Sequence, residues 1–150
     1  MNSDQEPPVA PLSEFPRWKE SCEDQSLEPE DFLATVVEAT EFPDDGIVIL
    51  LSLLWPRFAE ADGRVYLESR FAPEHLVDVP EDHASRPDFW LNLTLISTWV
   101  RDGGKAEWVA RILSEAWRAR LSHAFPNYTF AIETLVDGDD TAITFYRHMS

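Results

Sequence analysis

KAEWVARILSEAWRARLSHAFPNYTFAIETLVDGDDTAITFYRH, residues 105–148, decides the fold class because a helical pattern comes directly before a strand pattern. In residues 105–124, large apolar side chains recur at the i, i+3, i+4, i+7 spacing of one helix face. Arg111, Glu115 and Arg118 fall on the other side, and Pro126 stops the pattern. We therefore predict an amphipathic helix over residues 105–124 with this buried stripe: Val109, Ile112, Leu113, Ala116, Trp117 and Leu121.

The second half of the stretch indicates a β-hairpin. Tyr128, Phe130 and Ile132 alternate with smaller or polar residues, and Ile143 and Phe145 show the same alternation in the second run. The segment between the two runs, residues 137–140, is DGDD, which is a turn composition. Strands are predicted over residues 128–136 and 141–148.

A second hairpin is predicted earlier in the chain, at RFAEADGRVYLE, residues 57–68. Asp62-Gly63 between two short alternating runs specifies a two-residue type I′ turn, with strands near residues 57–61 and 64–69. Two hairpins can join into one antiparallel sheet of about four strands, covered on one face by about three or four helices. The fold class we expect is therefore α+β, with that single sheet.

The other helices are predicted from shorter signals. Pro29 and the acids after it suit the first turn of a helix over residues 29–40. The apolar run over residues 46–55 has no polar face, so its period cannot separate a helix from a strand, and its length and leucine content favour a helix. An irregular connector, with a helical turn at 73–76, leads to a helix predicted over residues 87–101.

The domain organisation follows from composition. Residues 1–28 hold several prolines among polar and acidic residues and predict a flexible, acidic extension, whereas residues 29–150 form one α+β domain. Phe15 and Trp18 stand out within the extension. They either fold back onto the protein's own domain or serve as a short linear motif for another protein.

Length and composition bound the class of protein. A chain of 150 residues with 44% hydrophobic content can bury a real core. Cys22 is the only cysteine, so no internal disulfide can form, and no signal peptide is recognisable. The longest apolar run, residues 47–55, is about half of what a membrane-spanning helix needs, and we assign it to the core. We expect a cytoplasmic protein that does not insert in a membrane.

Negative charge is concentrated near the N-terminus. Residues 1–45 contain 13 acids against Arg17 and Lys19, which gives −11 of the total net charge of −16. Such a segment is either a solubility device or a docking surface for a basic partner. Nucleic acids and anionic membranes are disfavoured as partners, because binding them requires clustered Lys and Arg.

No catalytic, cofactor or metal site is assigned from the sequence. His75, Asp78, Asp82 and His83 could together hold a metal, but their spacing matches no common zinc or iron pattern. Cys22 is flanked by acids, which oppose thiolate formation. The acids of residues 137–140 lack the spacing of a calcium loop. Glu60 and Glu133 could pair as carboxylates only if the two hairpins were adjacent.

The function hypothesis therefore rests on charge rather than on a motif. The first candidate is a non-enzymatic acidic module, of the immunity-protein, antitoxin-like or adaptor kind, that engages a basic protein partner. The alternative is an enzyme or small-ligand-binding domain with a site assembled from distant residues such as His75, His123, Glu133 and Arg147. Homo-oligomers through exposed Trp are compatible with both, and Trp90 and Trp108 could mark a partner surface if they lie outside the apolar stripes. The residues predicted to bind the partner are Glu38, Glu41, Asp44, Asp45, Phe15 and Trp18.

Overall fold

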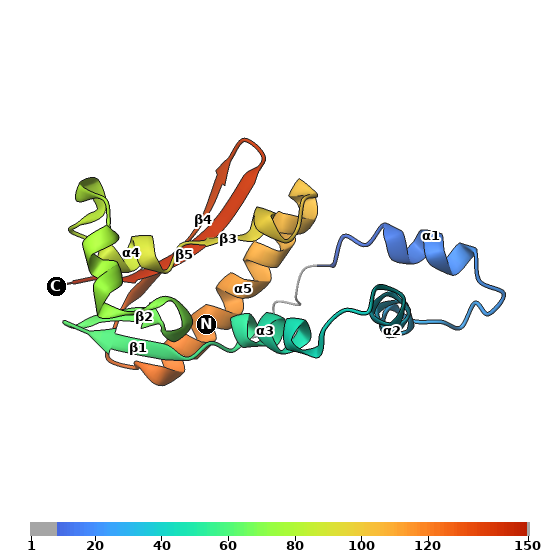
Figure 1. Ribbon diagram of the computed structural model, residues 1–150, viewed down its shortest axis with the longest axis horizontal. Helices are drawn as coiled ribbons and strands as arrows, with labels where there is room; N and C mark the ends of the chain where they lie inside the picture. The colour runs from blue at the N-terminus through green and yellow to red at the C-terminus, as the bar shows by residue number, and fades with distance from the viewer. Residues whose placement is uncertain (1–8, 150) are drawn as a thin grey trace.

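One long helix and a three-stranded sheet form the centre of the protein. The computed structural model describes residues 9–149, and within them α5 (Gly103–Ala124) packs against β4 (Phe130–Asp137) and β5 (Asp140–Arg147), as Figure 1 shows. Asp102 caps α5, because its side chain accepts a hydrogen bond from the backbone N–H of Lys105 at 2.9 Å. The predicted helix and the predicted hairpin after it are confirmed.

The buried face of α5 lies close to the predicted stripe. Trp117 is wholly buried, its ring meets Phe145 edge-on at 5.6 Å, and Leu113 and Leu121 are buried beside it. Val109 and Ile112 are only half-buried, because the stripe turns toward the smaller residues Ala106 and Ala110. The core therefore sits between this face of α5 and the sheet.

The sheet has the order β3-β5-β4, so β5 is its central strand. β3 (Thr94–Leu95) pairs with β5 through Thr94 opposite Ile143, and β4 pairs along the whole of β5. Side chains over residues 141–146 of β5 are all buried. A strand covered on both edges and both faces is the natural centre of a small core.

The first hairpin forms a separate two-stranded sheet. β1 (Phe58–Ala61) and β2 (Arg64–Leu67) are joined by Asp62 and Gly63, whose φ angles of 51° and 73° fit the predicted type I′ turn. The prediction of one sheet of four strands is wrong, because residues 9–149 form one sheet of two strands and one of three. The first hairpin joins the core through the side chains of Val65 and Leu67 instead.

Side chains from α4 (Pro87–Leu91) and its C-cap explain why the first hairpin cannot extend the larger sheet. Beyond β3, the outer edge of β5 continues with the carbonyl of Phe145 and the N–H of Arg147. Asn92 Nδ2 donates to the first at 3.1 Å, and Asp88 Oδ2 accepts from the second at 2.9 Å. Those backbone groups are therefore no longer open to another strand.

Asn92 also holds the first hairpin. Its Oδ1 accepts from the N–H of Leu67 at 2.8 Å, and its Nδ2 donates to the carbonyl of Val65 at 3.0 Å. Both backbone groups face away from β1, because Val65 and Leu67 occupy the positions of the hairpin that form no cross-strand hydrogen bonds. One buried amide thus joins β2 to β5.

The helix predicted over residues 87–101 is wrong in its second half. α4 ends at its C-cap Asn92, β3 follows, and the 3₁₀ helix η4 (Ile96–Thr98) comes after it. Asn92 and Thr94 are fully buried, and the local helical pattern is overridden because Asn92 bonds to β2 and β5 and Thr94 pairs with β5. A single helix face over residues 87–101 therefore does not form.

Asp88 forms the second connection between the sheets. The Asp88 carboxylate is wholly buried and accepts from Arg64 Nη1 at 2.8 Å as well as from Arg147 N. Arg147 Nη1 in turn donates to the carbonyl of Gly63. A buried carboxylate is tolerated here because charge-assisted and backbone hydrogen bonds meet both of its oxygens.

Between β2 and α4, the chain forms three short 3₁₀ helices: η1 (Glu68–Arg70), η2 (Pro73–Asp78) and η3 (Glu81–His83). The sequence predicted an irregular connector with a turn at 73–76, which lies within η2. Arg70 fixes the connector to the domain, since its Nη1 donates to the carbonyl of Leu93 and its backbone carbonyl meets Nδ1 of His75.

From residue 9 to the first hairpin, the structure describes three helices: α1 (Glu14–Glu20), α2 (Pro29–Thr40) and α3 (Asp44–Leu54). α2 and α3 were predicted, whereas α1 lies inside the segment predicted as an extension. In Figure 1, α1 and α2 lie on the side of α3 away from the two sheets. We call residues 9–40 the arm; the prediction for residues 1–8 falls outside the described residues.

The arm makes a polar contact with the start of α5. Lys105 Nζ donates to Ser13 Oγ at 2.8 Å and to Glu14 Oε2 at 3.2 Å. Within the arm, Glu28 and Asp31 form a reciprocal capping box that begins α2. Across the described part of the chain, no helix is both long and apolar enough to cross a membrane.

Candidate functional site

The main candidate site is the outer side of α3. Its residues are apolar around almost the whole helix, but only Leu53 and Leu54 pack against the core. Side chains elsewhere on α3 and at its C-cap are 52–64% exposed, and we call them the α3 face: Val48, Ile49, Leu50, Leu51 and Trp55. Contiguous exposed apolar side chains of this kind mark interaction surfaces in soluble proteins.

The inner side of α3 is held firmly against α5. The indole N–H of Trp117 donates to the carbonyl of Leu53 at 2.7 Å, near the end of α3. The guanidinium of Arg120 lies 5.2 Å from the Trp55 ring and 5.7 Å from the Phe58 ring. These contacts fix the orientation of α3, and with it the direction in which the α3 face points.

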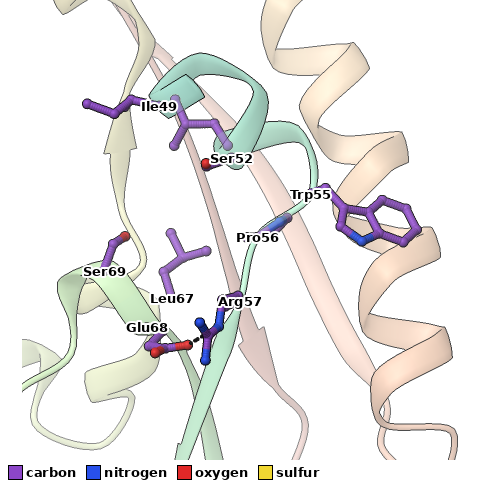
Figure 2. Close-up of a pocket in the computed structure, with 9 residues that line it drawn as sticks. Ile49, Ser52, Trp55, Pro56, Arg57, Leu67, Glu68 and Ser69 are labelled. Atoms are coloured by element: carbon purple, nitrogen blue, oxygen red, sulfur yellow. Dashed lines mark ion pairs between the residues drawn. The ribbon is translucent and has the colours of Figure 1, made fainter. Parts of the chain in front are cut away.

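A cavity opens between α3 and the first hairpin (Figure 2). Its volume is about 520 Å³, and its lining combines α3 side chains with residues that flank β1 and β2: Ile49, Ser52, Trp55, Arg57, Leu67 and Glu68. Arg57 Nε and Glu68 Oε2 form an ion pair of 2.9 Å beside it, and both side chains are largely exposed. We call this space the α3 cavity.

A second cavity, of about 300 Å³, lies on the other flank of α3. It is formed with α5 and the segment before it, and every lining side chain is apolar: Leu50, Leu53, Leu54, Trp99, Val100, Trp108, Val109, Ile112 and Leu113. Trp108 and Trp99 thus border a cavity beside α3. The exposed helix is therefore a ridge with a depression along each side.

Acidic side chains lie at the N-terminal end of that ridge. Glu38 and Glu41 end α2, and Asp44 and Asp45 form the first turn of α3, where negative charge is favoured by the helix dipole. All four are exposed, and we call them the acidic junction. Residues 20–56 contain ten acids and no Lys or Arg. The structure thus places Asp44 and Asp45 on α3 itself, directly before the α3 face, and Glu38 and Glu41 at the end of the preceding helix.

Phe15 and Trp18 lie elsewhere. Their rings pack on Phe32 of α2 at 6.2 Å and 5.4 Å between centroids, and each is half-buried. The contact is therefore with the chain's own arm rather than with its core. The geometry accounts for α1, because burying two aromatic rings offsets part of the cost of ordering a short helix.

The residues proposed for metal or enzyme chemistry do not gather in one site, although the sequence neighbours Asp82 and His83 meet, with 3.7 Å between Asp82 Oδ2 and His83 Nε2. His83 stacks on Trp90 at 5.0 Å, and His75 meets the carbonyl of Arg70. His123 is exposed near the end of α5. Over residues 9–149, no group of three or more His, Cys, Asp or Glu side chains could hold a metal ion. Cys22 is half-buried, and its Sγ donates to the carbonyl of Trp18 at 3.3 Å.

Glu60 and Glu133 each accept a hydrogen bond from a different tyrosine. Glu60 accepts from Tyr128 at 2.5 Å and Glu133 from Tyr146 at 2.6 Å. Each hydrogen bond raises the pKa of its tyrosine above the ordinary value, because the phenol donates to a carboxylate only while it is protonated. The arrangement is a pair of Tyr–Glu contacts, not a paired-carboxylate site.

Sequence reasoning assigned residues 46–55 to the core and so missed the α3 face. A run that is apolar all round normally indicates a fully covered element. The sequence of the run does not show how many other elements will cover the helix. In the structure, α3 packs mainly on α5.

The chain matches no protein-family model, and comparisons with curated proteins and with solved structures give no significant match. The surface of the described residues is therefore the basis for a functional proposal.

Proposed function

We propose that this chain is a non-enzymatic protein-binding module, of the immunity-protein, antitoxin-like or adaptor kind, that engages a basic protein partner in the cytoplasm. The observation that supports it most directly is the acidic junction, whose four carboxylates are exposed in a stretch of 37 residues, 20–56, without one Lys or Arg. A surface of one charge sign attracts an oppositely charged partner over about a Debye length, near 8 Å at physiological salt.

This charge should act mainly on the association rate. Exposed carboxylates remain hydrated, so each adds little to the final contact, but together they steer a basic partner toward the surface and repel acidic proteins. Such a role needs no catalytic group. Under this proposal, the net charge of −16 attracts the partner as well as favouring solubility.

The test replaces the acidic junction by neutral isosteres: Glu38→Gln, Glu41→Gln, Asp44→Asn and Asp45→Asn. A matched control neutralises four exposed acids of the connector instead: Glu74→Gln, Asp78→Asn, Glu81→Gln and Asp82→Asn. Both variants change net charge by the same amount. A basic partner is first captured from the native organism, and its association rate is measured at low and at physiological ionic strength.

The proposal expects the junction variant to associate about tenfold or more slowly at low salt, with a flatter salt dependence, and the control variant to change much less. Equal slowing in both variants would show that only net charge matters. Unchanged rates in the junction variant would overturn the proposal and leave the acids as a solubility device.

The α3 cavity supports a second candidate, a small-ligand-binding domain. Its volume of about 520 Å³ lies within the usual range for ligand pockets, and Ser52, Arg57 and Glu68 add polar groups to an apolar lining. A thermal-shift screen with small amphipathic molecules tests it. A hit whose effect is lost in Ser52→Leu, but not in Ser122→Leu on the exposed end of α5, would favour this candidate.

A further inference from the structure

We propose that the α3 face is the docking site for an amphipathic, basic α-helix of the partner, which packs along α3 and places an apolar side chain in the α3 cavity. The inference rests on the proposed function, because it specifies the partner's chemistry and the surface it uses. It goes further by placing the stable contact on apolar residues, with the acidic junction as their charged border.

The chain itself supplies no described cover for this face. The aromatic residues of α1 are already packed on Phe32 in the arm. Outside the described residues, the N-terminal segment MNSDQEPP has Met1 as its only large apolar side chain and two acids. A segment of that composition cannot supply the row of apolar side chains that the α3 face would need.

A helix is the form of occupant that suits this surface. The backbone N–H and C=O groups of α3 are used within the helix, so the surface offers no strand edge on which an extended peptide could add. Val48, Leu51 and Trp55 follow one another at i, i+3 and i+7, which makes a ridge along one side of α3. Ridges of this kind interlock with the grooves between the side chains of a second helix.

The two flanking depressions add depth to the ridge. The α3 cavity adjoins Ile49 and Trp55, and the second cavity adjoins Leu50. A large side chain inserted into such a depression is the usual anchor of a helix-in-groove complex. The α3 cavity, at about 520 Å³, is larger than the second, at about 300 Å³, and Arg57 and Glu68 form a polar lip beside it.

Charge decides against a second copy of the same chain as the occupant. Two copies would bring two acidic junctions, and two chains of net charge −16, against each other. Like charges at close range oppose such an interface, whereas Lys or Arg flanking the apolar row of a partner helix would meet Asp44 and Asp45 at the start of α3. The structure therefore favours a basic helix.

The probe is a synthetic peptide of Leu and Lys, about 18 residues long, with its leucines at helical spacing. Three comparison ligands isolate the requirements: the same composition in strand-like alternation, a helical peptide of Leu and Glu, and neutral phosphatidylcholine vesicles. Binding to the full chain is followed by fluorescence anisotropy of the labelled peptide, and by co-sedimentation for the vesicles.

Two variants locate the contact. Val48→Ser with Leu51→Ser alters the α3 face, and Val77→Ser with Val136→Ser removes the same kind of exposed apolar surface elsewhere. The proposal expects the helical Leu–Lys peptide to bind the unchanged chain and to lose about tenfold or more in affinity with the α3 variant. The control variant should stay within about twofold.

Several outcomes would overturn the inference: equal binding of the alternating peptide, equal binding of the Leu–Glu helix, or vesicle binding that depends on Leu51. Self-association of the unchanged chain that Leu51→Ser abolishes would assign the face to a second copy instead. Weaker binding in the junction variant but not in the α3 variant would overturn the docking site and leave the proposed function standing. Weaker binding in the α3 variant alone would support the docking site and count against electrostatic steering.

Discussion

Replacing Asn92 by Leu should remove the hydrogen bonds that join the two sheets while keeping the branched arrangement of heavy atoms in the side chain. Asn92 is fully buried and makes three hydrogen bonds to backbone groups, to Leu67 N at 2.8 Å, Val65 O at 3.0 Å and Phe145 O at 3.1 Å. Leucine has the same branching at Cγ but satisfies none of these backbone groups. Three buried backbone groups therefore lose their only side-chain partner.

The expected cost is about 3–5 kcal/mol. Each buried polar group left unpaired costs about 1–3 kcal/mol, and the apolar side chain recovers part of the sum, because it carries no polar atoms of its own to desolvate. A loss of that size is a large fraction of the total stability of a typical domain, about 5–15 kcal/mol.

Urea unfolding followed by tryptophan fluorescence measures the change, with Asn127→Leu as the matched control in an exposed turn. The control should change the free energy of unfolding by about 0.5 kcal/mol or less. A loss below about 1 kcal/mol for Asn92→Leu would refute the reasoning, since it would show that the sheets are held by side-chain packing alone.

Three further predictions concern the core, the arm and the tyrosines. Trp117→Ala should cost about 3–5 kcal/mol in chemical unfolding, and Arg118→Ala, in an exposed ion pair with Glu115, about 0.5 kcal/mol or less; equal effects would reject the helix phase. Deleting residues 1–28 should lower Tm by less than about 5 °C, because α1 contacts α2 and reaches α5 through Lys105; a larger calorimetric drop would place the arm in the core. Tyr66, Tyr128 and Tyr146 all have pKa values raised above the ordinary 10.0, Tyr66 by burial and the others by their Glu partners. Their stabilising effect is therefore complete below pH 10.0 and is lost as pH rises through the folded values; an ultraviolet titration of the folded protein showing any tyrosine ionising at or below 10.0 would contradict this.

Local patterns were sufficient for the parts of the fold that are held by neighbours in sequence. The spacing of Leu113, Trp117 and Leu121 predicted α5, and Asp62-Gly63 predicted the first turn, because helix faces and two-residue turns depend on adjacent residues. The α+β class followed from these elements.

Long-range contacts explain where sequence reasoning failed. Nothing near Asn92 reveals that its amide will meet strands from residues 64–67 and 140–147, so the helix was continued to residue 101. Because such long-range contacts are invisible in the local sequence, the two hairpins were also predicted to form one sheet. The edge of β5 that the first hairpin would need is taken by β3, Asn92 and Asp88, and those residues come from the segment read as a helix.

The candidate site was predicted only in its charged half. Asp44, Asp45 and the glutamates before them are exposed, as an acidic segment favours, but the exposed apolar side of α3 was taken for core. Hydrophobicity says that a segment gains from being covered; it does not say whether the cover belongs to the same chain. The position of α3, against α5 on one side alone, supplies that distinction.

The central place of β5 has a consequence for the order in which the protein can fold during synthesis. The ring of Phe145 contacts Phe58, Trp117 and Phe130, and its carbonyl accepts from Asn92. Neighbouring residues of the strand bond to residues 63, 88 and 89. All of these partners leave the ribosome before β5 does. Until the strand emerges, α5, the first hairpin and α4 have no common surface to pack on, so their apolar faces remain exposed to solvent. Folding of this domain is therefore a late, single event, and a nascent chain paused before β5 would be a ready substrate for chaperones.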